Sequence, residues 1–345
     1  MDHRGMNCLL AVIAFLMLVE FSQTLSVLKA RQVTDATNQQ LVDPAITDPK
    51  AIHADKIMWY TQDPDQQDHI RLHWLALSFP ASIYRPRLRA TFLYFLYLSM
   101  AAYGDYRTLC PSTFAVEGNE FEVLQDFETA EGQKGFVARV PFMQKIVIVF
   151  RGYDSVVPLS WEVVPIDFGR PFPRCTGHNE CTTGRGILQL YNSARIATDN
   201  WAVAKQAVNA TGLKFSVTGH GIGGSVAQLA ALDLGTQGLV HYAHSQAAPR
   251  SMSPTAARIL SEVFQGESGQ HAVANHDYFP HMIPRSKDFV RVNSAVWIFG
   301  NRTEWMRNCH YYAENIACLG NGTSIQDNYY YFTPLGQCGS ADKGF

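Results

Sequence analysis

The segment KFSVTGHGIGGSVAQLAALDL, residues 214–234, decides the fold. Its first five residues include β-branched and aromatic side chains and are typical of a short, buried strand. Its last ten residues have the apolar spacing of a helix, and the glycine-rich GHGIGG between them is a turn. A strand followed directly by a helix is the repeating unit of an α/β domain with a largely parallel central sheet.

The same alternation continues on both sides of this segment. The run KIVIVF at 145–150 predicts a central strand, because it is continuous, apolar and β-branched. Residues 87–103 are a long apolar segment flanked by Arg and by Gly-Asp, which favours a buried helix over a membrane span. Residues 186–210 carry apolar side chains at helical spacing. Further strands are predicted at 121–126, 135–140, 239–245, 271–275 and 289–299.

The glycines of the turn fit two different kinds of site. Gly219, Gly221 and Gly224 match G-x-G-x-x-G, the dinucleotide-binding fingerprint. That fingerprint needs an Asp or Glu about 20 residues later, and residues 241–245 (HYAHS) contain no carboxylate. The turn fits better as the nucleophile elbow G-x-S-x-G, which requires small residues two before and two after a strained central residue. Gly219 and Gly223 meet this requirement, and Gly221 stands at the centre.

The elbow and several other segments together resemble the fungal class 3 lipases and related feruloyl esterases. VTGHGIGGSVAQLAAL resembles their GHSLGG elbow with its alanine-rich helix, and KIVIVFRGYDS with Trp161 resembles their strand, oxyanion loop and lid. Residues 175–191 resemble the family's disulfide loop and helix entry, and AAPRSMS a strand end. NHDYFPHMIPR resembles the segment of the triad aspartate, and QDNYYYF that of the triad histidine. The resemblance spans roughly residues 75–340 and implies the α/β-hydrolase fold.

The resemblance implies an incomplete catalytic triad. It assigns the acid to Asp277, the nucleophile to Gly221 and the base to Asn328. Glycine carries no nucleophile and an amide does not take up a proton near neutral pH, so ester hydrolysis is expected to be lost. The oxyanion-hole N–H groups map onto Ile222 and onto Tyr153, where the family normally has Ser or Thr.

Nearby residues offer little compensation for the missing groups. Ser225 lies one helical turn beyond Gly221, and Ser216 lies within the preceding strand. His220, His276 and His281 are more simply explained by local packing or capping. An active lipase or esterase with a displaced nucleophile and base is the alternative hypothesis. A secreted interaction protein or decoy is a third.

The lid position, residues 156–172, contains Trp161 and several other apolar side chains. An amphipathic lid over an apolar groove would bind a lipid or apolar ester and contact a lipid interface, although an ordinary loop packed into the core explains the same residues. Nucleic acid is not an expected partner, because the chain has a net charge of −2 and no dense run of Lys and Arg. No cofactor is expected, and the oligomeric state is not specified.

The N-terminus is typical of a secreted protein. Arg4 precedes the apolar run CLLAVIAFLMLV, and small and polar residues follow it. We predict a signal peptide at 1–26, a polar propeptide-like extension at 27–70, and a lipase-like domain at 71–345. An N-terminal membrane anchor is the alternative interpretation of the apolar run.

Cysteines and glycosylation sequons also fit secretion. Outside the signal peptide there are six cysteines, which allow 15 pairings. His178 and His310 lie beside cysteines, but the C-x2–4-C spacing of zinc sites is missing, so no metal is expected. The spacing favours the pairs Cys175–Cys181, Cys309–Cys318 and Cys110–Cys338. N-glycan attachment is predicted at Asn209, Asn301 and Asn321.

Overall fold

The computed structural model describes residues 86–114, 120–153, 165–167, 172, 175, 180–264, 269–283, 288–292, 295–298, 306–308 and 322–339. The predicted signal peptide at 1–26 and the extension at 27–70 lie outside these residues, so their boundaries stay predictions. The lid residue Trp161 also lies outside them. So do the cysteines Cys309 and Cys318 and the sequon residues Asn301 and Asn321.

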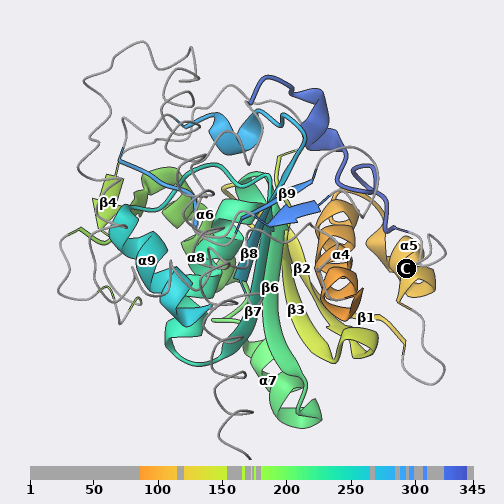
Figure 1. Ribbon diagram of the computed structural model, residues 1–345. Helices are drawn as coiled ribbons and strands as arrows, with labels where there is room; N and C mark the ends of the chain where they lie inside the picture. The colour runs from red at the N-terminus through yellow and green to blue at the C-terminus, as the bar shows by residue number, and fades with distance from the viewer. Residues whose placement is uncertain are drawn as a thin grey trace, which may run out of the picture. The chain divides into compact units, whose positions relative to one another are not determined.

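Strands make up the centre of the described part of the chain. They are β1 (Glu122–Glu128), β2 (Lys134–Val140), β3 (Lys145–Phe150), β4 (Pro165–Asp167), β5 (Thr182–Gly184), β6 (Lys214–His220), β7 (Val240–Gln246), β8 (Gly269–Ala274), β9 (Ala295–Ile298) and β10 (Met306–Asn308). Eight of them form one sheet in the order β1-β2-β3-β6-β7-β8-β9-β10, and β4 pairs with β5 (Figure 1). Pairing is parallel from β3 to β9 and antiparallel at both edges. The predicted α/β domain with a largely parallel sheet is confirmed.

Helices cover both faces of this sheet. They are α4 (Pro86–Ala101), α5 (Tyr106–Thr113), α6 (Arg185–Ala197), α7 (Ala202–Thr211), α8 (Ile222–Thr236) and α9 (Pro254–Val263), with 3-10 turns at η3 (Pro141–Met143), η6 (Phe279–His281) and η8 (Gln326–Tyr329). In Figure 1, α4 lies on one face and α6, α8 and α9 lie on the other. The sequence pattern predicts neither α5 nor α9.

Each face of the sheet has its own buried core. Ile146, Ile148 and Phe150 of β3 join the core beneath α6, α8 and α9, here called the α8-side core. Val147 and Val149 of the same strand join the core beneath α4, here called the α4-side core. Successive residues of a strand point to opposite faces, so a continuous apolar run such as KIVIVF supplies both. The prediction of a doubly buried central strand at 145–150 is confirmed.

Helix α4 confirms the buried helix predicted at 87–103. From Phe92 to Ala102 every residue is buried, including the polar Ser99. A helix that is apolar on all sides belongs in an interior, and here it fills the space between the sheet and the C-terminal segment. Among the helices that the structure describes, none has the length and hydropathy needed to cross a bilayer.

Two predicted elements differ in extent from the structure. Of the strand expected at 289–299, the described residues form β9, and Val290 makes an isolated bridge to Met252. The helical pattern at 186–210 is divided into α6 and α7. Between them Asp199, Asn200 and Trp201 have positive φ, and the fully buried Trp201 ring packs against Phe127 and Phe150. Burial of this ring in the α8-side core accounts for the break.

Two of the three predicted disulfides are present among the described residues. Cys110 of α5 is bonded to Cys338 across 228 positions of sequence, and Cys175 is bonded to Cys181 across six. The first bond ties α5 to the C-terminal segment beside the α4-side core. Of the predicted glycosylation sites, Asn209 is exposed on α7, and a glycan there stays a prediction.

Candidate active site

The candidate site is centred on the turn between β6 and α8, here called the elbow, which consists of His220, Gly221 and Ile222. Gly221 has φ 58° and ψ −127°, a conformation that residues with a Cβ adopt only at a cost. Its N–H donates to the carbonyl of Gln246 at 2.8 Å, and its own carbonyl accepts from the N–H of Gly224 at 2.9 Å. The turn thus has the strained geometry that a nucleophile elbow requires.

Close backbone contacts explain the glycines on either side of Gly221. A Cβ on Gly219 would overlap the carbonyl of Gly223, and a Cβ on Gly223 would overlap the carbonyl of Phe150. Among the described residues, a Cβ on Gly221 would meet only the Tyr103 hydroxyl, at 3.8 Å. At Gly221, therefore, backbone conformation and not space favours glycine, and a serine side chain would fit.

The acid position, Asp277, lies just beyond β8 and is fully buried. Its Oδ1 accepts a hydrogen bond from the Phe279 N–H at 2.9 Å. Its Oδ2 accepts from the Asn328 side-chain amide at 3.1 Å and from the Tyr331 hydroxyl at 2.6 Å. Burial raises the pKa of Asp277 to about 7, while these three donors act in the opposite direction.

The base position, Asn328, is thus brought beside the acid position. Asn328 lies on η8 and is 5% exposed, so its amide is held in place as a donor to Asp277. A neutral amide fills the place next to the carboxylate without offering a site for a proton. Tyr331, which no sequence motif assigns to the site, is the third donor to this carboxylate. The sequence feature that could have indicated Tyr331 is its place in the QDNYYYF segment, three residues after Asn328.

A tyrosine and a histidine link the elbow to this acid cluster. The Tyr103 hydroxyl accepts from the Gly152 N–H at 3.0 Å and is hydrogen-bonded to Nδ1 of His220 at 2.9 Å. The His220 ring lies edge-on to Tyr331, with the centroids 5.3 Å apart. Burial lowers the pKa of His220 to about 3, and the nearby Asn328 backbone partly opposes this shift. His220 is therefore a neutral, packed residue, in line with the expected local packing.

Two backbone N–H groups at the elbow have no acceptor among the described residues. They belong to Ile222, the first residue of α8, and to Tyr153. The loop with Tyr153 lies against the elbow, because a Cβ on Gly152 would come within 2.5 Å of the His220 carbonyl. The Tyr153 side chain is 36% exposed. The two positions that the resemblance assigned to the oxyanion hole thus lie on neighbouring segments, and their role there stays a prediction.

The candidate substitutes for the nucleophile and base occupy structural positions. The Ser225 hydroxyl donates to the carbonyl of Pro249 at 3.0 Å, and Ser216 is fully buried within β6. Neither His276 nor His281 bonds to the Asp277 carboxylate, whose donors are the three named above. Within the described residues no cluster of His, Cys, Asp and Glu is suited to hold a metal ion.

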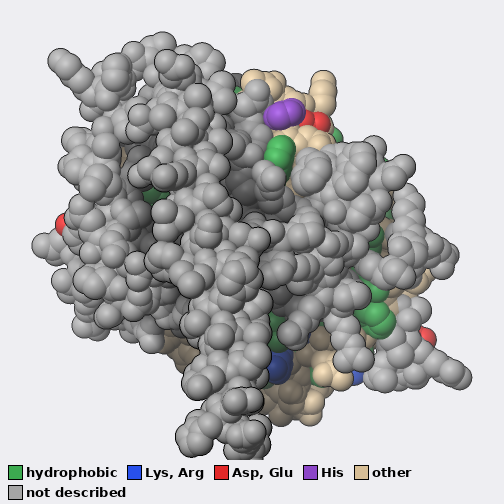
Figure 2. All heavy atoms as spheres, in the orientation of Figure 1, with side chains coloured by type: hydrophobic (Ala, Val, Ile, Leu, Met, Phe, Trp, Pro, Cys, Tyr) green, Lys and Arg blue, Asp and Glu red, His purple; other side chains and the backbone are tan. Residues whose placement is uncertain are grey.

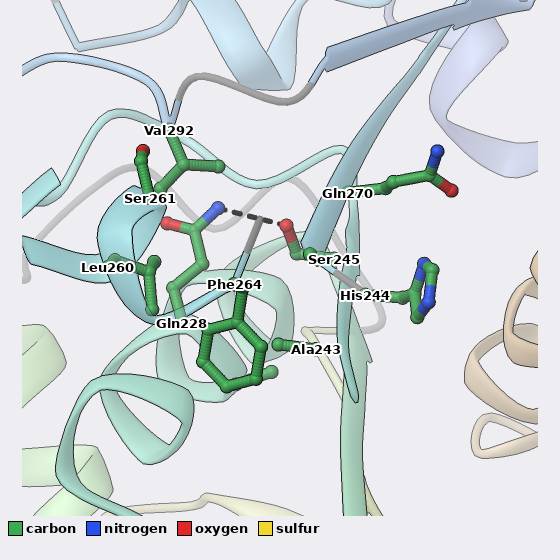
Figure 3. Close-up of a pocket in the computed structure, with 11 residues that line it drawn as sticks. Gln228, Ala243, His244, Ser245, Leu260, Ser261, Phe264, Gln270 and Val292 are labelled. Atoms are coloured by element: carbon green, nitrogen blue, oxygen red, sulfur yellow. Dashed lines mark hydrogen bonds between the residues drawn. The ribbon is translucent and has the colours of Figure 1, made fainter. Parts of the chain in front are cut away.

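A serine–histidine pair does occur beside a small cavity between α8, α9, β7 and β8, which Ser245 lines and His271 does not (Figure 3). The Ser245 hydroxyl accepts from the Gln228 amide at 2.9 Å and lies 3.2 Å from Nδ1 of His271. In Figure 3, Gln228 and Ser245 point toward one another, whereas His244 points away from the cavity. Ser245 is 3% exposed and His271 is fully buried, so the pair is shielded from an ester in solvent.

Comparison with known proteins relates the chain to fungal lipases. Residues 147–287 match the model of the family described as lipase (class 3). A curated lipase from Rhizomucor miehei is 29% identical over 211 residues, which cover 57% of this chain and 54% of the relative. The chain thus spans about half the length of that relative.

Solved structures of fungal lipases share the fold of this chain. Lipase II from Rhizopus niveus has a TM-score of 0.61 at 23% identity, covering 74% of this chain and 98% of that one. The native propeptide complex of Rhizomucor miehei lipase has a TM-score of 0.57 at 23% identity, covering 74% and 84%. The expected α/β-hydrolase fold is confirmed.

Proposed function

The chain belongs to the class 3 lipase family, and from this premise we propose that it is a secreted lipase-like protein that has lost ester hydrolysis. The observation that carries the proposal is the combination of Gly221 at the elbow with the Asn328 amide bonded to Asp277. Secretion is supported by the Cys110–Cys338 and Cys175–Cys181 disulfides, which form and persist in oxidising compartments.

The lost activity follows from what the two positions can do chemically. A serine hydrolase needs a hydroxyl at the elbow and an imidazole that takes its proton. Gly221 has no atom to attack an ester, and Asn328 presents a donor to the acid where a base would accept a proton. Removing triad members from a serine protease leaves about 10³–10⁴-fold catalysis over water, which comes from the oxyanion hole and from binding.

Binding of a lipid or an apolar ester is the second part of the proposal. Its support is membership of the family together with the N–H groups of Ile222 and Tyr153, which have no acceptor among the described residues. A ligand carbonyl placed there would accept both hydrogen bonds, as a substrate carbonyl does in an active hydrolase. The ligand would be held without being cleaved.

Restoring the missing groups tests the loss of activity. We expect no turnover of short-chain or long-chain esters by the wild-type chain, and measurable turnover by the double variant Gly221→Ser with Asn328→His. The open space beside Gly221 accommodates the serine, and Asp277 is already placed to orient the histidine. The matched control is Gly221→Ser with Asn328→Gln, which restores the nucleophile but no base and should stay inactive.

An active enzyme with a displaced nucleophile is the competing function, and the Ser245–His271 pair is the observation in its favour. Wild-type turnover accompanied by one-to-one labelling with a serine-directed phosphonate would overturn the proposed loss of activity. Labelling mapped to Ser245, with activity abolished in Ser245→Ala, would assign the reaction to that pair.

Ligand binding requires a separate measurement. A fluorescent fatty acid titrated into the wild-type chain should bind saturably, and no bound lipid would be hydrolysed. Absence of saturable binding, with no native lipid co-purifying, would remove the binding part of the proposal and favour a protein that acts through other partners.

A further inference from the structure

A pair of lysines faces one tyrosine at the end of the sheet opposite to the elbow. Lys145 is the first residue of β3 and Lys214 the first of β6, and parallel pairing places them side by side. The Nζ atom of Lys145 lies 3.7 Å from the centroid of the Tyr242 ring, and that of Lys214 lies 5.8 Å from it. We call these three residues the lysine-pair cluster.

The cluster lies on the α4 side of the sheet. Lys145 alternates with Val147 and Val149 of the α4-side core, which also receives part of the Tyr242 ring. The two lysines differ in their access to solvent: Lys145 is 6% exposed, whereas Lys214 is exposed. Figure 2 shows basic side chains in the lower part of one face of the molecule, near the position of α7 in Figure 1.

In the described part of the chain, no carboxylate balances the positive charge of the cluster. Within the described residues, neither Lys145 nor Lys214 forms an ion pair with Asp or Glu. Burial lowers the pKa of Lys145 to about 8, and the neighbouring charge of Lys214 acts in the same direction. Lysine is rarely buried unless it is paired. The face of Tyr242 offsets only part of the cost, since a cation–π contact is weaker than a buried ion pair with hydrogen bonds.

We propose that Lys145 and Lys214 bind a phosphate dianion, either free or as the phosphomonoester headgroup of a lipid. Two ammonium groups directed at one ring match the two charges of the dianion, whereas a carboxylate would neutralise only one. Lysine binds phosphate as a flexible point charge, so no rigid bidentate geometry is needed. Lys214 is exposed, so a phosphate can reach it from solvent. Lys145 is buried, and its ammonium attracts the phosphate more strongly because its surroundings screen charge poorly.

Equilibrium dialysis of the full chain against radiolabelled inorganic phosphate, at neutral pH and fixed ionic strength, tests this site. We expect saturable binding of one phosphate per chain. Lys145→Met and Lys214→Met should each weaken it by about tenfold or more, the loss typical of a charged hydrogen bond. The matched control is Lys205→Met on α7, which removes a lysine outside the cluster and should leave binding unchanged.

A second arm distinguishes the source of the phosphate. Vesicles of phosphatidylcholine with or without phosphatidic acid are sedimented with the wild-type chain and the three variants. Binding of free phosphate supports a soluble ligand. Lys145-dependent sedimentation with phosphatidic acid alone, without uptake of free phosphate, supports a lipid headgroup. Neither arm measures ester hydrolysis, so the outcome is independent of the proposed loss of activity.

Two results would overturn the proposal. One is the absence of saturable binding in both arms. The other is binding that survives in both Lys145→Met and Lys214→Met. Because Lys214 is exposed, its replacement does not disturb the core, and circular dichroism of each variant excludes loss of fold as the cause of lost binding.

Discussion

At the residue scale, Gly221 has space for a side chain, but its backbone conformation strains any residue with a Cβ. A nucleophile at this position must tolerate that strain, which costs on the order of 1–3 kcal/mol. In this chain glycine relieves it. Loss of the nucleophile and stability of the fold are therefore compatible, and the scaffold can persist without the reaction.

We predict that Gly221→Ser alone lowers the free energy of unfolding by about 1–3 kcal/mol, because the serine adopts the same positive φ. Urea unfolding of the variant and the wild type measures the change. Gly221→Ala is the matched control, since it introduces the same strain without a hydroxyl and should lose the same amount. Wild-type stability in both variants would show that strain does not select glycine here.

Motifs in the sequence predict positions of the candidate site but not all of the contacts there, and the roles of these positions stay predictions. Gly221, Asp277 and Asn328 sit in motifs, and the structure places Asp277 and Asn328 in direct contact. Tyr103 and Tyr331 were not foreseen, because each acts through a hydrogen bond to a residue distant in sequence. Periodicity and motif spacing describe local structure and carry no signal for such long-range pairs.

At the scale of elements, β7 and α4 bury an ionisable ring between them. His244 of β7 is 2% exposed and stacks on Phe95 of α4, with the centroids 4.3 Å apart. Neither of its ring nitrogens has a hydrogen-bond partner among the described residues. Burial lowers the pKa of His244 to about 3, and the charge of Lys145 acts in the same direction. The contact between these elements thus depends on a neutral imidazole.

Burial of His244 predicts that acid destabilises the folded chain and that replacing His244 removes this effect. The folded-state pKa lies below the ordinary value of about 6.5. The stabilising contribution is therefore present above that value and is lost as the pH falls toward 3. Between pH 7 and pH 3, the unfolding free energy of the wild type should fall by about 4 kcal/mol more than that of His244→Leu. The variant has no imidazole to protonate at this position.

Urea unfolding across this pH range measures the difference, and the exposed His241→Leu on the same strand is the control. Asp277 contributes in the opposite direction. Its raised pKa gives stability that is present below its ordinary pKa and is lost as the pH rises through about 7. This contribution is common to both proteins and cancels in the comparison. Equal acid sensitivity of His244→Leu and the wild type would contradict the prediction.

The elements themselves were predictable where burial on both faces leaves a continuous apolar run, as in β3 and α4. Elements were not predicted correctly where contacts between residues distant in sequence determine their bounds. Pro111 inside α5 obscured that helix. Ser253 caps α9 and Pro254 begins it, which is a helix-start signal that the sequence itself carries. The break after α6 depends on the buried Trp201, whose ring packs against Phe127 of β1, far away in the sequence.

At the scale of the whole molecule, the two described disulfides close loops of very different length. The Cys110–Cys338 bond closes most of the domain, and Cys175–Cys181 closes a short segment. Cross-linking reduces the entropy of the unfolded chain more when the loop is longer. The long-range bond should therefore contribute more to stability.

We predict that replacing both Cys110 and Cys338 by serine lowers the free energy of unfolding by about 2–5 kcal/mol. Replacing both Cys175 and Cys181 by serine should have a smaller effect. Urea unfolding of the two double variants beside the wild type provides the comparison. An equal loss in the two variants would argue against loop length as the cause.

The Cys110–Cys338 bond also sets the path of a mechanical load. Tension applied to the two ends of the chain crosses from one cysteine to the other through the sulfur atoms, so the strands between them bear none of it. Helix α4 precedes Cys110 and lies outside this protected loop. A pull on the chain would therefore strip α4 from the sheet and stop there, leaving a bare apolar face on a sheet whose strands remain paired.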